Sequence, residues 1–191
     1  MRIKLGLHNH SQMSDGYFTV GGLLRYLKDY YDVICISDHN CYTILHPIQL
    51  RESEAEDLLI LRGIEVTFPQ IHMICLEPIR HETVKDCLDT ARVAYIAHPF
   101  FSGLNPFDCQ MIINKYHLDG VELYNNGHIN FKGEIDGNFY AGDDLHIPSQ
   151  VMTSWMEMDV DSLDKETVLE KLKSGDYELF NRPMNGGVTE W

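Results

Sequence analysis

The segment "GLHNHSQMSDG" (residues 6–16) places two histidines one residue apart at the end of a short apolar run, followed by an aspartate and a glycine. Histidine is not a favoured strand residue, so this polar pair requires partners elsewhere in the chain. In an extended strand, residues i and i+2 point to the same side of the sheet. His8 and His10 are therefore able to reach one ion together.

The composition is typical of one globular domain. The chain has 191 residues, of which 44% are hydrophobic, enough for an ordinary core. Its 29 Asp and Glu exceed its 15 Lys and Arg, which gives a formal net charge of -14. This charge repels long phosphate backbones, so we do not expect long nucleic acid as a partner. A small phosphorylated substrate remains compatible, because bound cations reverse the local sign.

The cysteines and the N-terminus indicate the compartment. Five cysteines without C-x-x-C spacing predict free thiols in a reducing environment: Cys35, Cys41, Cys75, Cys87 and Cys109. The start, "MRIKLGLHNH", lacks the apolar region of a signal peptide, and no apolar run approaches membrane-spanning length. We therefore expect a cytoplasmic protein without a membrane partner, and the sequence leaves its oligomeric state open.

Short apolar runs alternate with amphipathic segments along the chain. Strands are expected at residues 3–7, 32–37, 58–66, 71–76, 93–97, 120–124, 138–142 and 151–158. Helices are expected at residues 20–31, 82–92 and 107–117, and residues 164–180 read as a helix with a closing strand. This alternation predicts an α/β fold with a mostly parallel sheet, which could close as a barrel related to the TIM type.

Polar residues follow most of the expected strands. They are His8, His10, Asp38, His39, Glu65, His98, Glu122, Asp143 and Asp144. Because the carboxyl ends of parallel strands share one face, we expect these side chains to gather there. In "GDDLH" (142–146) the i, i+2 rule puts Asp144 and His146 on one side and Asp143 on the other. Imidazole and carboxylate ligands together suit Zn, Mn or Fe.

Six motifs occur in order along this chain: H-x-H with a following S-D-G, then S-D-H, G-I-E, H-M-I-C-L, A-H-P and G-D-D-L-H. In this order and with these gaps they resemble the PHP (polymerase and histidinol phosphatase) family over residues 8–146. The C-terminal helix pattern of that family continues in "ETVLEKLKSGDYELF" (166–180). The resemblance implies a single domain over residues 1–191, folded as a distorted seven-stranded (β/α) TIM-like barrel that holds two or three divalent ions.

The resemblance also carries nine ligand positions over to this chain: His8, His10, Asp15, His39, Glu65, His72, His98, Asp144 and His146. It implies that His8, His10 and Asp144 hold a first ion. Glu65 would bridge the first ion to a second, which His72 and His98 complete. Asp15, His39 and His146 would hold a third. Three carboxylates offset only half of the charge of three divalent ions, and the remainder attracts a phosphate dianion.

The implied reaction is hydrolysis of a small phosphomonoester or nucleotide-like substrate by a metal-bound hydroxide. Asp15, His39 and His146 would lie near the reacting water. Two alternatives stay open: a protein (tyrosine) phosphatase of the same family, and a metal-binding regulatory domain without catalysis. The sequence departs from the family pattern at Asp143, where Ser is usual, and at Cys75, where Gly is common. It also has no room for the subdomain that longer members insert before the last motif.

Other polar residues have less specific interpretations. Asp38 either orients a ligand or serves as a structural acid, Glu122 either supports the site or is solvated, and Asp143 either supports a ligand or faces solvent. Two residues are weak candidates for substrate contact, namely His128 and Arg182, of which Arg182 reads more readily as a tail residue. We expect three histidines to lie on the surface, away from the site: His46, His81 and His117.

Overall fold

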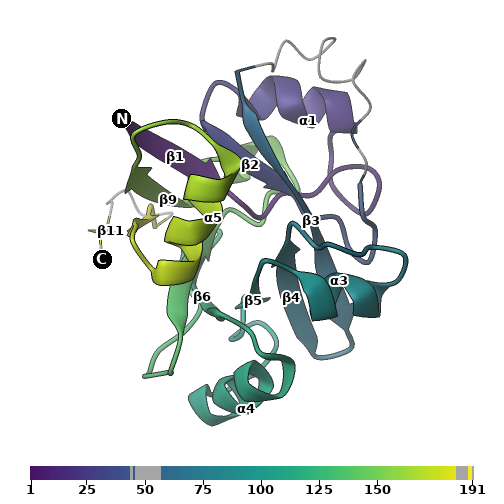
Figure 1. Cartoon of the computed structure of the whole chain (residues 1–191), viewed down its shortest axis with the longest axis vertical. Coiled ribbons are helices and arrows are strands. Elements are labelled where there is room, and N and C mark those ends of the chain that lie inside the picture. Colours follow the sequence, from purple (N-terminus) through teal and green to yellow (C-terminus); the bar gives the residue numbers. More distant parts are fainter. Residues whose placement is uncertain (44, 46–56, 184–188, 191) are drawn as a thin grey trace.

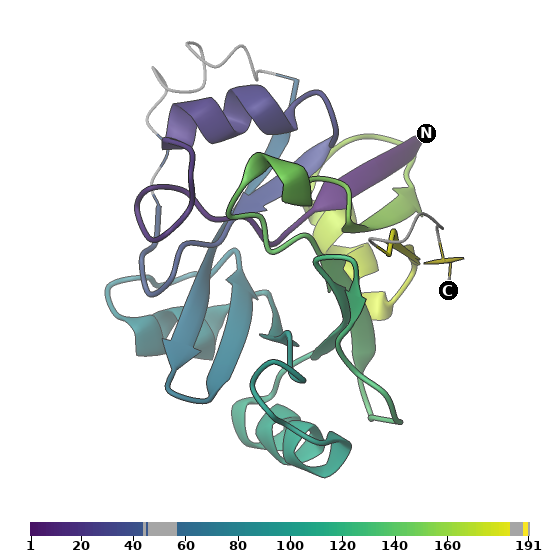
Figure 2. The ribbon, with the colours of Figure 1, turned by 180° about the vertical axis from the view of Figure 1, so that it is seen from behind.

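The computed structural model describes residues 1–43, 45, 57–183 and 189–190. Its eleven strands form one sheet in the order β11-β10-β9-β1-β2-β3-β4-β5-β6-β7, with β8 paired to β6. Figures 1 and 2 show this sheet curving around the middle of the molecule, with α1 and α4 at opposite ends. The fold is thus mixed α/β. Of the sequence-based expectations, the one for His46 lies outside the described residues.

The strands are β1 (Arg2–Gly6), β2 (Val33–Ile36), β3 (Leu59–Phe68), β4 (Ile71–Leu76), β5 (Val93–Ala97), β6 (Gly120–Asn125), β7 (His128–Ile129), β8 (Asn138–Gly142), β9 (Ser154–Asp159), β10 (Glu178–Asn181) and β11 (Thr189–Glu190). Every expected strand is confirmed, and β4, β5 and β8 have the same bounds as expected. The two-residue strands β7 and β11 are additional, because two residues give too short a pattern to detect in a sequence.

The helices are α1 (Val20–Leu27), α3 (Val84–Thr90), α4 (Pro106–Tyr116) and α5 (Lys165–Ser174), with a short 3₁₀ turn at Pro148–Gln150. The four α-helices in the described part of the chain were all expected, and each is preceded by a residue whose side chain accepts a hydrogen bond from the first turn. Such N-caps satisfy backbone N–H groups that have no partner inside the helix. Local sequence therefore fixes where these helices start.

The sheet nearly closes on itself between β1 and β8. At one end, β9 pairs antiparallel with β1 and lies close to β8. At the other end, the chain beyond β1 pairs directly with the chain beyond β8, through a parallel bridge between Asn9 and Leu145. The hydrogen bonds of this bridge, His10 N–H to Leu145 O (2.9 Å) and Leu145 N–H to His8 O (3.2 Å), join the two strand ends. The first and last sequence motifs consequently lie side by side.

The expectation of a distorted seven-stranded (β/α) TIM-like barrel is confirmed only in part: the fold is α/β and the sheet is barrel-like, but it does not follow a regular β/α repeat. β3 pairs antiparallel with β4, β4 with β5, β1 with β9 and β9 with β10. Only residues 69 and 70 connect β3 to β4, whereas a parallel pair needs a crossover of a dozen or more residues. Helices also separate only some of the strands. The result is a barrel-like mixed sheet rather than a series of seven repeated β/α units.

Two hydrophobic clusters hold this sheet. The larger contains Leu5, Val33, Ile74 and Ile96 from the strands and the buried faces of α3, α4 and α5. The smaller lies between α1 and the sheet and contains Leu23, Leu27 and Ile34, with Leu145 and Trp155. Because Leu145 immediately follows Asp144, burial of its side chain in the smaller cluster anchors the last motif to the fold. None of the helices in the described part of the chain is long and apolar enough to cross a membrane.

Candidate metal centre

Four side chains form a deep group in the middle of the molecule: His8, His10, Glu65 and Asp144. The Nε2 atoms of His8 and His10 lie 3.4 and 3.2 Å from Oε2 of Glu65. The same two atoms lie 3.3 and 3.4 Å from Oδ1 of Asp144. His8, His10 and Glu65 are completely buried. The two histidines thus present one nitrogen each to the same carboxylates, as their i, i+2 spacing predicts.

Glu65 joins the deep group to three further histidines. Its Oε1 lies 2.9 Å from Nδ1 of His72 and 3.1 Å from Nε2 of His98, and its Oε2 lies 3.0 Å from Nδ1 of His39. His72 stands at the start of β4 rather than at a strand end, and the β3–β4 hairpin brings it back beside Glu65. Glu65 therefore touches five histidines and occupies a bridging position.

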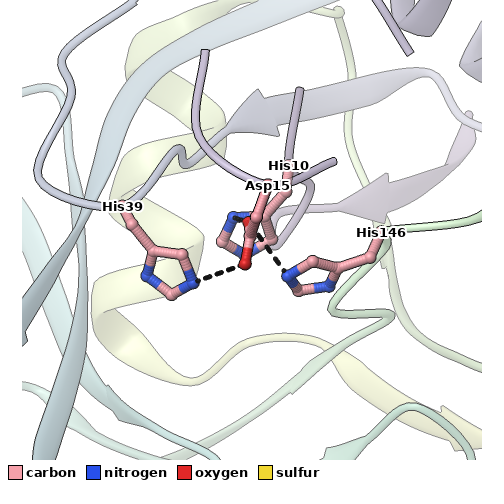
Figure 3. A group of neighbouring side chains, drawn as sticks. All are labelled: His10, Asp15, His39 and His146. Carbon is pink, nitrogen blue, oxygen red and sulfur yellow. Dashed lines mark ion pairs between the residues drawn. The ribbon is translucent and has the colours of Figure 1, made fainter. Parts of the chain in front are cut away.

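A third set of donors, the rim group, consists of the partly exposed Asp15, His39 and His146. Figure 3 shows Asp15 between His39 and His146, next to His10. Carboxylate oxygens of Asp15 lie 3.2 Å from Nε2 of His146, 3.6 Å from Nε2 of His39 and 3.6 Å from Nδ1 of His10. The side chain of Asp15 is 54% exposed. Together the deep and rim groups and the neighbours of Glu65 contain all nine residues that the sequence singled out, and their donor atoms form overlapping sets able to hold metal ions.

Unpartnered buried atoms test whether metal ions fit here. Among the described residues, Nε2 of His8, Nε2 of His10, Oε2 of Glu65 and Nδ1 of His98 are buried without a hydrogen-bond partner. Burying an unpaired polar atom is costly, and burying an unpaired charge costs more. The edges of a tetrahedral Zn²⁺ site with bonds of about 2.0–2.1 Å measure about 3.3 Å, close to the donor separations in the deep group. The residues present therefore fit a divalent ion.

The electrostatics of the deep group also favour a cation. Burial would raise the pKa of Glu65, but its histidine neighbours, His8 foremost, hold it well below its ordinary value. The pKa of Asp144 is lowered for the same reason. Burial would lower the pKa of His8, but the carboxylates of Glu122, Asp144 and Glu65 raise it well above its ordinary value. The two carboxylates are thus ionised at neutral pH, and a bound metal would replace protons on the histidines.

Glu122 supports the deep group, which resolves the two interpretations of this residue. Its Oε1 lies 2.8 Å from Nδ1 of His8, which leaves Nε2 of His8 free to face Glu65 and Asp144. Its Oε2 accepts hydrogen bonds from the backbone N–H of His98 (2.9 Å) and from the side chain of Asn125 (2.8 Å). Carboxylates that bond the far nitrogen of a ligand histidine fix its tautomer and orientation.

Asp38 holds the loop that carries Asp15. Its carboxylate accepts hydrogen bonds from the backbone N–H and hydroxyl of Ser11, both at 2.7 Å, from Ser14 at 2.8 Å and from Thr43 at 2.7 Å. None of these partners is one of the nine donors. Asp38 therefore acts on the site through the backbone between His10 and Asp15.

Asp143 is buried and does not face solvent. It accepts hydrogen bonds from the backbone N–H groups of Met152, Thr153 and Ser154, each at 2.9 Å, and from the hydroxyl of Tyr31. Burial raises the pKa of Asp143 to about 6. Its carboxylate anchors the turn before β9, on the opposite side of the chain from Asp144. Of the two interpretations of Asp143, the solvent-facing one is wrong, because the turn at 152–154 folds over this residue.

The backbone is strained at two of the nine residues. His98 and Asp144 have positive φ angles of 28° and 50°, which cost non-glycine residues about 1–3 kcal/mol. The surrounding fold therefore holds His98 and Asp144 in backbone conformations that these residues do not favour.

Gly142 in β8 lies directly against the deep group. A Cβ atom added at this position would stand 2.6 Å from Oε1 of Glu122 and 2.7 Å from Cβ of His8, so a larger residue would displace them.

The remaining candidates lie at or beyond the edge of the site. His128 is exposed on β7, where its ring contacts that of Phe101. The guanidinium of Arg182 lies over the ring of Trp155, 5.7 Å from its centroid. His81 stacks on Tyr42, and His117 ends α4, so neither belongs to the donor sets. Sequence reasoning missed Thr67, whose hydroxyl lies 2.7 Å from Nδ1 of His39; its position two residues after Glu65 on the same strand is the signal for it.

No family model and no curated protein matches this sequence. Solved structures do match its fold. A two-domain protein from Bacteroides vulgatus, described as containing a predicted PHP-like metal-dependent phosphoesterase, superposes with a TM-score of 0.71 at 15% identity. That match covers 95% of this chain and 65% of the other. The chain has the PHP-like fold.

A second match is to a nuclease. The lesion-specific endonuclease PfuEndoQ from Pyrococcus furiosus superposes with a TM-score of 0.60 at 13% identity, over 100% of this chain and 58% of the endonuclease. This chain therefore spans about two thirds or less of either solved protein. At these identities the likeness establishes the fold, and the expected resemblance is confirmed at that level.

Proposed function

We propose that this protein is a metal-dependent phosphoesterase that hydrolyses a small phosphomonoester or a nucleotide-like substrate. The observation that carries the proposal is the convergence of nine imidazole and carboxylate side chains on one point, with buried donor atoms left unpartnered at its centre. The fold that this chain shares with a protein described as containing a predicted PHP-like metal-dependent phosphoesterase supports it.

We assign the donors to two or three divalent ions, Zn, Mn or Fe. His8, His10 and Asp144 would hold the first ion, and Glu65 would bridge it to a second. His72 and His98 flank Glu65 on its other oxygen and would complete the second site. Asp15, His39 and His146 would hold a third ion at the opening. When bound, these ions supply Lewis acidity, neutralise phosphate charge and lower the pKa of a bound water.

The side chains themselves then have distinct tasks. Glu122 holds the ring of His8 in one orientation, and Thr67 does the same for His39. Asp15 and His146, which are partly exposed, are the donors that a substrate entering from solvent meets first. If only the two inner ions were bound, His39 or His146 would be free to hand a proton to a leaving oxygen, because each has its Nε2 directed toward Asp15.

The charge distribution favours a small substrate over long nucleic acid. The chain carries a formal charge of -14, and in the described part of the chain no ion pair of the nine donors involves Lys or Arg. A nuclease that tracks a phosphate backbone needs positive charge along its groove. The phosphate of a small ester requires positive charge only at the metal centre.

The test combines metal analysis with turnover. Purified protein would be measured for bound Zn, Mn and Fe by mass spectrometry, and for phosphate release from a panel of sugar phosphates, nucleotides, phosphotyrosine and a phosphotyrosine peptide. We expect release that a chelator abolishes, that added Mn²⁺ or Zn²⁺ restores, and that His8→Ala eliminates. His81→Ala is the matched control, because His81 lies outside the donor sets.

The outcomes separate the alternatives. Release from the peptide but not from small esters would favour the protein phosphatase interpretation. Bound metal without phosphate release from any substrate would favour the interpretation as a regulatory metal-binding domain without catalysis. Equal loss of activity in His8→Ala and His81→Ala would contradict the assignment of the donors.

A further inference from the structure

Two consecutive phenylalanines follow the donor His98, and they have different surroundings. Phe100 is 40% exposed and its ring lies against the buried Phe131, with 6.4 Å between centroids. Phe101 is 71% exposed, and its ring stands edge-to-face with the rings of His98 and His128, each at 6.4 Å. Phe101 is therefore a large apolar side chain held in solvent directly beside the proposed metal centre.

The backbone that carries this pair is well fixed. The N–H of Phe101 bonds to His98 O (3.1 Å), and the N–H of Leu104 bonds to Pro99 O (2.9 Å), so the loop closes on itself. The N–H of Phe100 bonds to Asn130 O (3.2 Å), which ties the loop to the end of β7. We call Phe101 and His128 the aromatic rim; both project from segments that are fixed before any ligand arrives.

His128 is equally fixed, by the β6–β7 hairpin. The two residues between these strands, Asn126 and Gly127, both have positive φ, 47° and 75°. This is the geometry of a tight two-residue hairpin turn. The N–H of Gly127 also bonds to the hydroxyl of Ser154 at 2.9 Å. The position of His128 relative to Phe101 therefore does not depend on a mobile tip.

The metal centre itself offers little that distinguishes one phosphate ester from another. Its donors would bind the phosphate group through metal ions. Among the described residues, the ion pairs of these donors include no Lys or Arg that would bind a second negative group of the substrate. Selectivity for the organic part of a substrate must come from side chains around the opening. The aromatic rim is such a surface, and planar rings stack on aromatic side chains.

We propose that the aromatic rim binds a planar aromatic ring in the organic part of the substrate, with Phe101 as the stacking surface and His128 at its edge. This inference rests on the proposed function, since it names the substrate class for the same metal centre. The protein then prefers aryl phosphates or nucleotides to aliphatic phosphate esters of similar size.

The experiment compares matched esters with and without an aromatic ring. Phenyl phosphate is paired with cyclohexyl phosphate, and AMP with ribose 5-phosphate, and kcat/KM is measured for wild type, Phe101→Ala and Phe107→Ala. Phe107 is the control because it is also 71% exposed but lies at the start of α4. We expect Phe101→Ala to lower kcat/KM about tenfold, or about 1.4 kcal/mol, for the ring-bearing member of a pair only. Phe107→Ala should change neither member.

The two pairs distinguish the sources of the ring. A selective loss for phenyl phosphate alone means that the ring is attached directly to the ester oxygen, as in an aryl phosphate. A selective loss for AMP alone means that the nucleobase, separated from the phosphate by the sugar, contacts the aromatic rim. Phe101→Tyr, which keeps the ring, should restore the preference. Equal effects of Phe101→Ala on both members of each pair, or no effect on any, would overturn the proposal.

A binding measurement separates this proposal from the proposed function. Titration calorimetry of the metal-loaded protein with phenylphosphonate and cyclohexylphosphonate requires no turnover. Tighter binding of the phenyl compound that disappears in Phe101→Ala supports the aromatic rim, even if no ester is hydrolysed. Equal affinity of the two compounds for wild type would reject the aromatic rim, even if phosphate esters are hydrolysed.

Discussion

The deep group and the rim group use the same residue types in different surroundings. His8, His10 and Glu65 are completely buried, and the unpartnered Nε2 atoms of the two histidines lie 3.4 and 3.2 Å from Oε2 of Glu65. Asp15 is more than half exposed, and His39 and His146 are about one quarter exposed. Water can solvate the rim donors in the absence of metal, whereas the deep donors are shielded from solvent and need a proton or a metal ion between them.

This difference predicts two kinds of metal site in one centre. The deep donors must be ordered by the fold and compensated by an ion, so metal binding there should be tight and coupled to stability. Removal of the ion costs the solvated rim donors less free energy, so the ion at the rim group should exchange readily. The predictions below test this contrast, in order from the largest effect to the smallest.

Glu65→Gln should have the largest effect. Glu65 touches five histidines and would bridge two ions, so removal of its charge weakens both sites at once. We expect loss of bound metal and a fall in activity of at least about a hundredfold, beyond the range seen when only a supporting residue is changed. Metal content by mass spectrometry and phosphate release measure it. Glu170→Gln, on the exposed face of α5, is the control, and retention of full metal content in Glu65→Gln would contradict the bridging role.

Glu122→Gln should weaken metal binding at the deep group and leave metal binding at the rim group unchanged. The change alters the partner of Nδ1 of His8 without removing a donor. Metal affinity at the deep group should fall about 10- to 100-fold, as for other residues that orient a ligand. Competition with a chelator of known affinity measures this loss. An equal loss at both groups would show that Glu122 supports the fold as a whole rather than His8.

Asp15→Asn should have a smaller effect confined to the rim. Its carboxylate is mostly solvated, so removal of the charge should cost about fivefold in affinity for the rim ion. The deep ions should stay bound, and the melting temperature should hardly change. Stepwise metal titration followed by calorimetry resolves the two classes of site. Loss of all metal in Asp15→Asn would contradict the separation of deep from rim.

The smallest effect on metal binding is expected for a change at an ion pair away from the centre. Glu77 is almost fully buried and accepts hydrogen bonds from the Arg62 guanidinium (2.7 Å) and from Lys165 (3.2 Å). Burial would raise its pKa, but Arg62 and Lys165 lower it. A carboxyl with a lowered folded-state pKa stabilises the protein above its unfolded-state pKa, and this stabilisation is lost as the pH falls through the folded-state pKa.

Glu77→Gln should therefore lower the free energy of unfolding at pH 7 by about 1–3 kcal/mol. The difference in free energy of unfolding between wild type and Glu77→Gln should become smaller at acidic pH, below the ordinary pKa of a glutamate side chain. Urea unfolding of the metal-free protein across a pH series tests this without interference from the metal centre. A constant difference at all pH values would mean that packing, rather than charge, explains the contribution of Glu77.

Much of the fold was predictable because its signals are local. The apolar runs at 71–76, 93–97 and 138–142 are strands with the expected bounds. Helix starts follow from capping residues within one turn. The pairing of the strands was less predictable. The two-residue link between β3 and β4 already forbids a parallel crossover, and that link, rather than any polar pattern, brings His72 beside Glu65.

The supporting residues were the least predictable part of the site. Glu122 and Asp143 are both buried acids in or after a strand, yet one orients His8 and the other anchors the turn before β9. Nothing in their immediate neighbours separates these roles. Each role depends on what lies across the sheet, and for Glu122 the irregular pairing of β6 with β8 adjusts which side chains face inward.

By itself the sequence determined which side chains can serve as metal donors, because residue type fixes ligand chemistry and the i, i+2 rule fixes the face within one strand. Only the tertiary structure decided which donors meet, how deeply each is buried, and that Phe101 rather than Phe100 contacts the ring of the donor His98. The reason is physical: distances between residues far apart in the chain follow from strand pairing and register, and burial follows from the packing of the whole sheet.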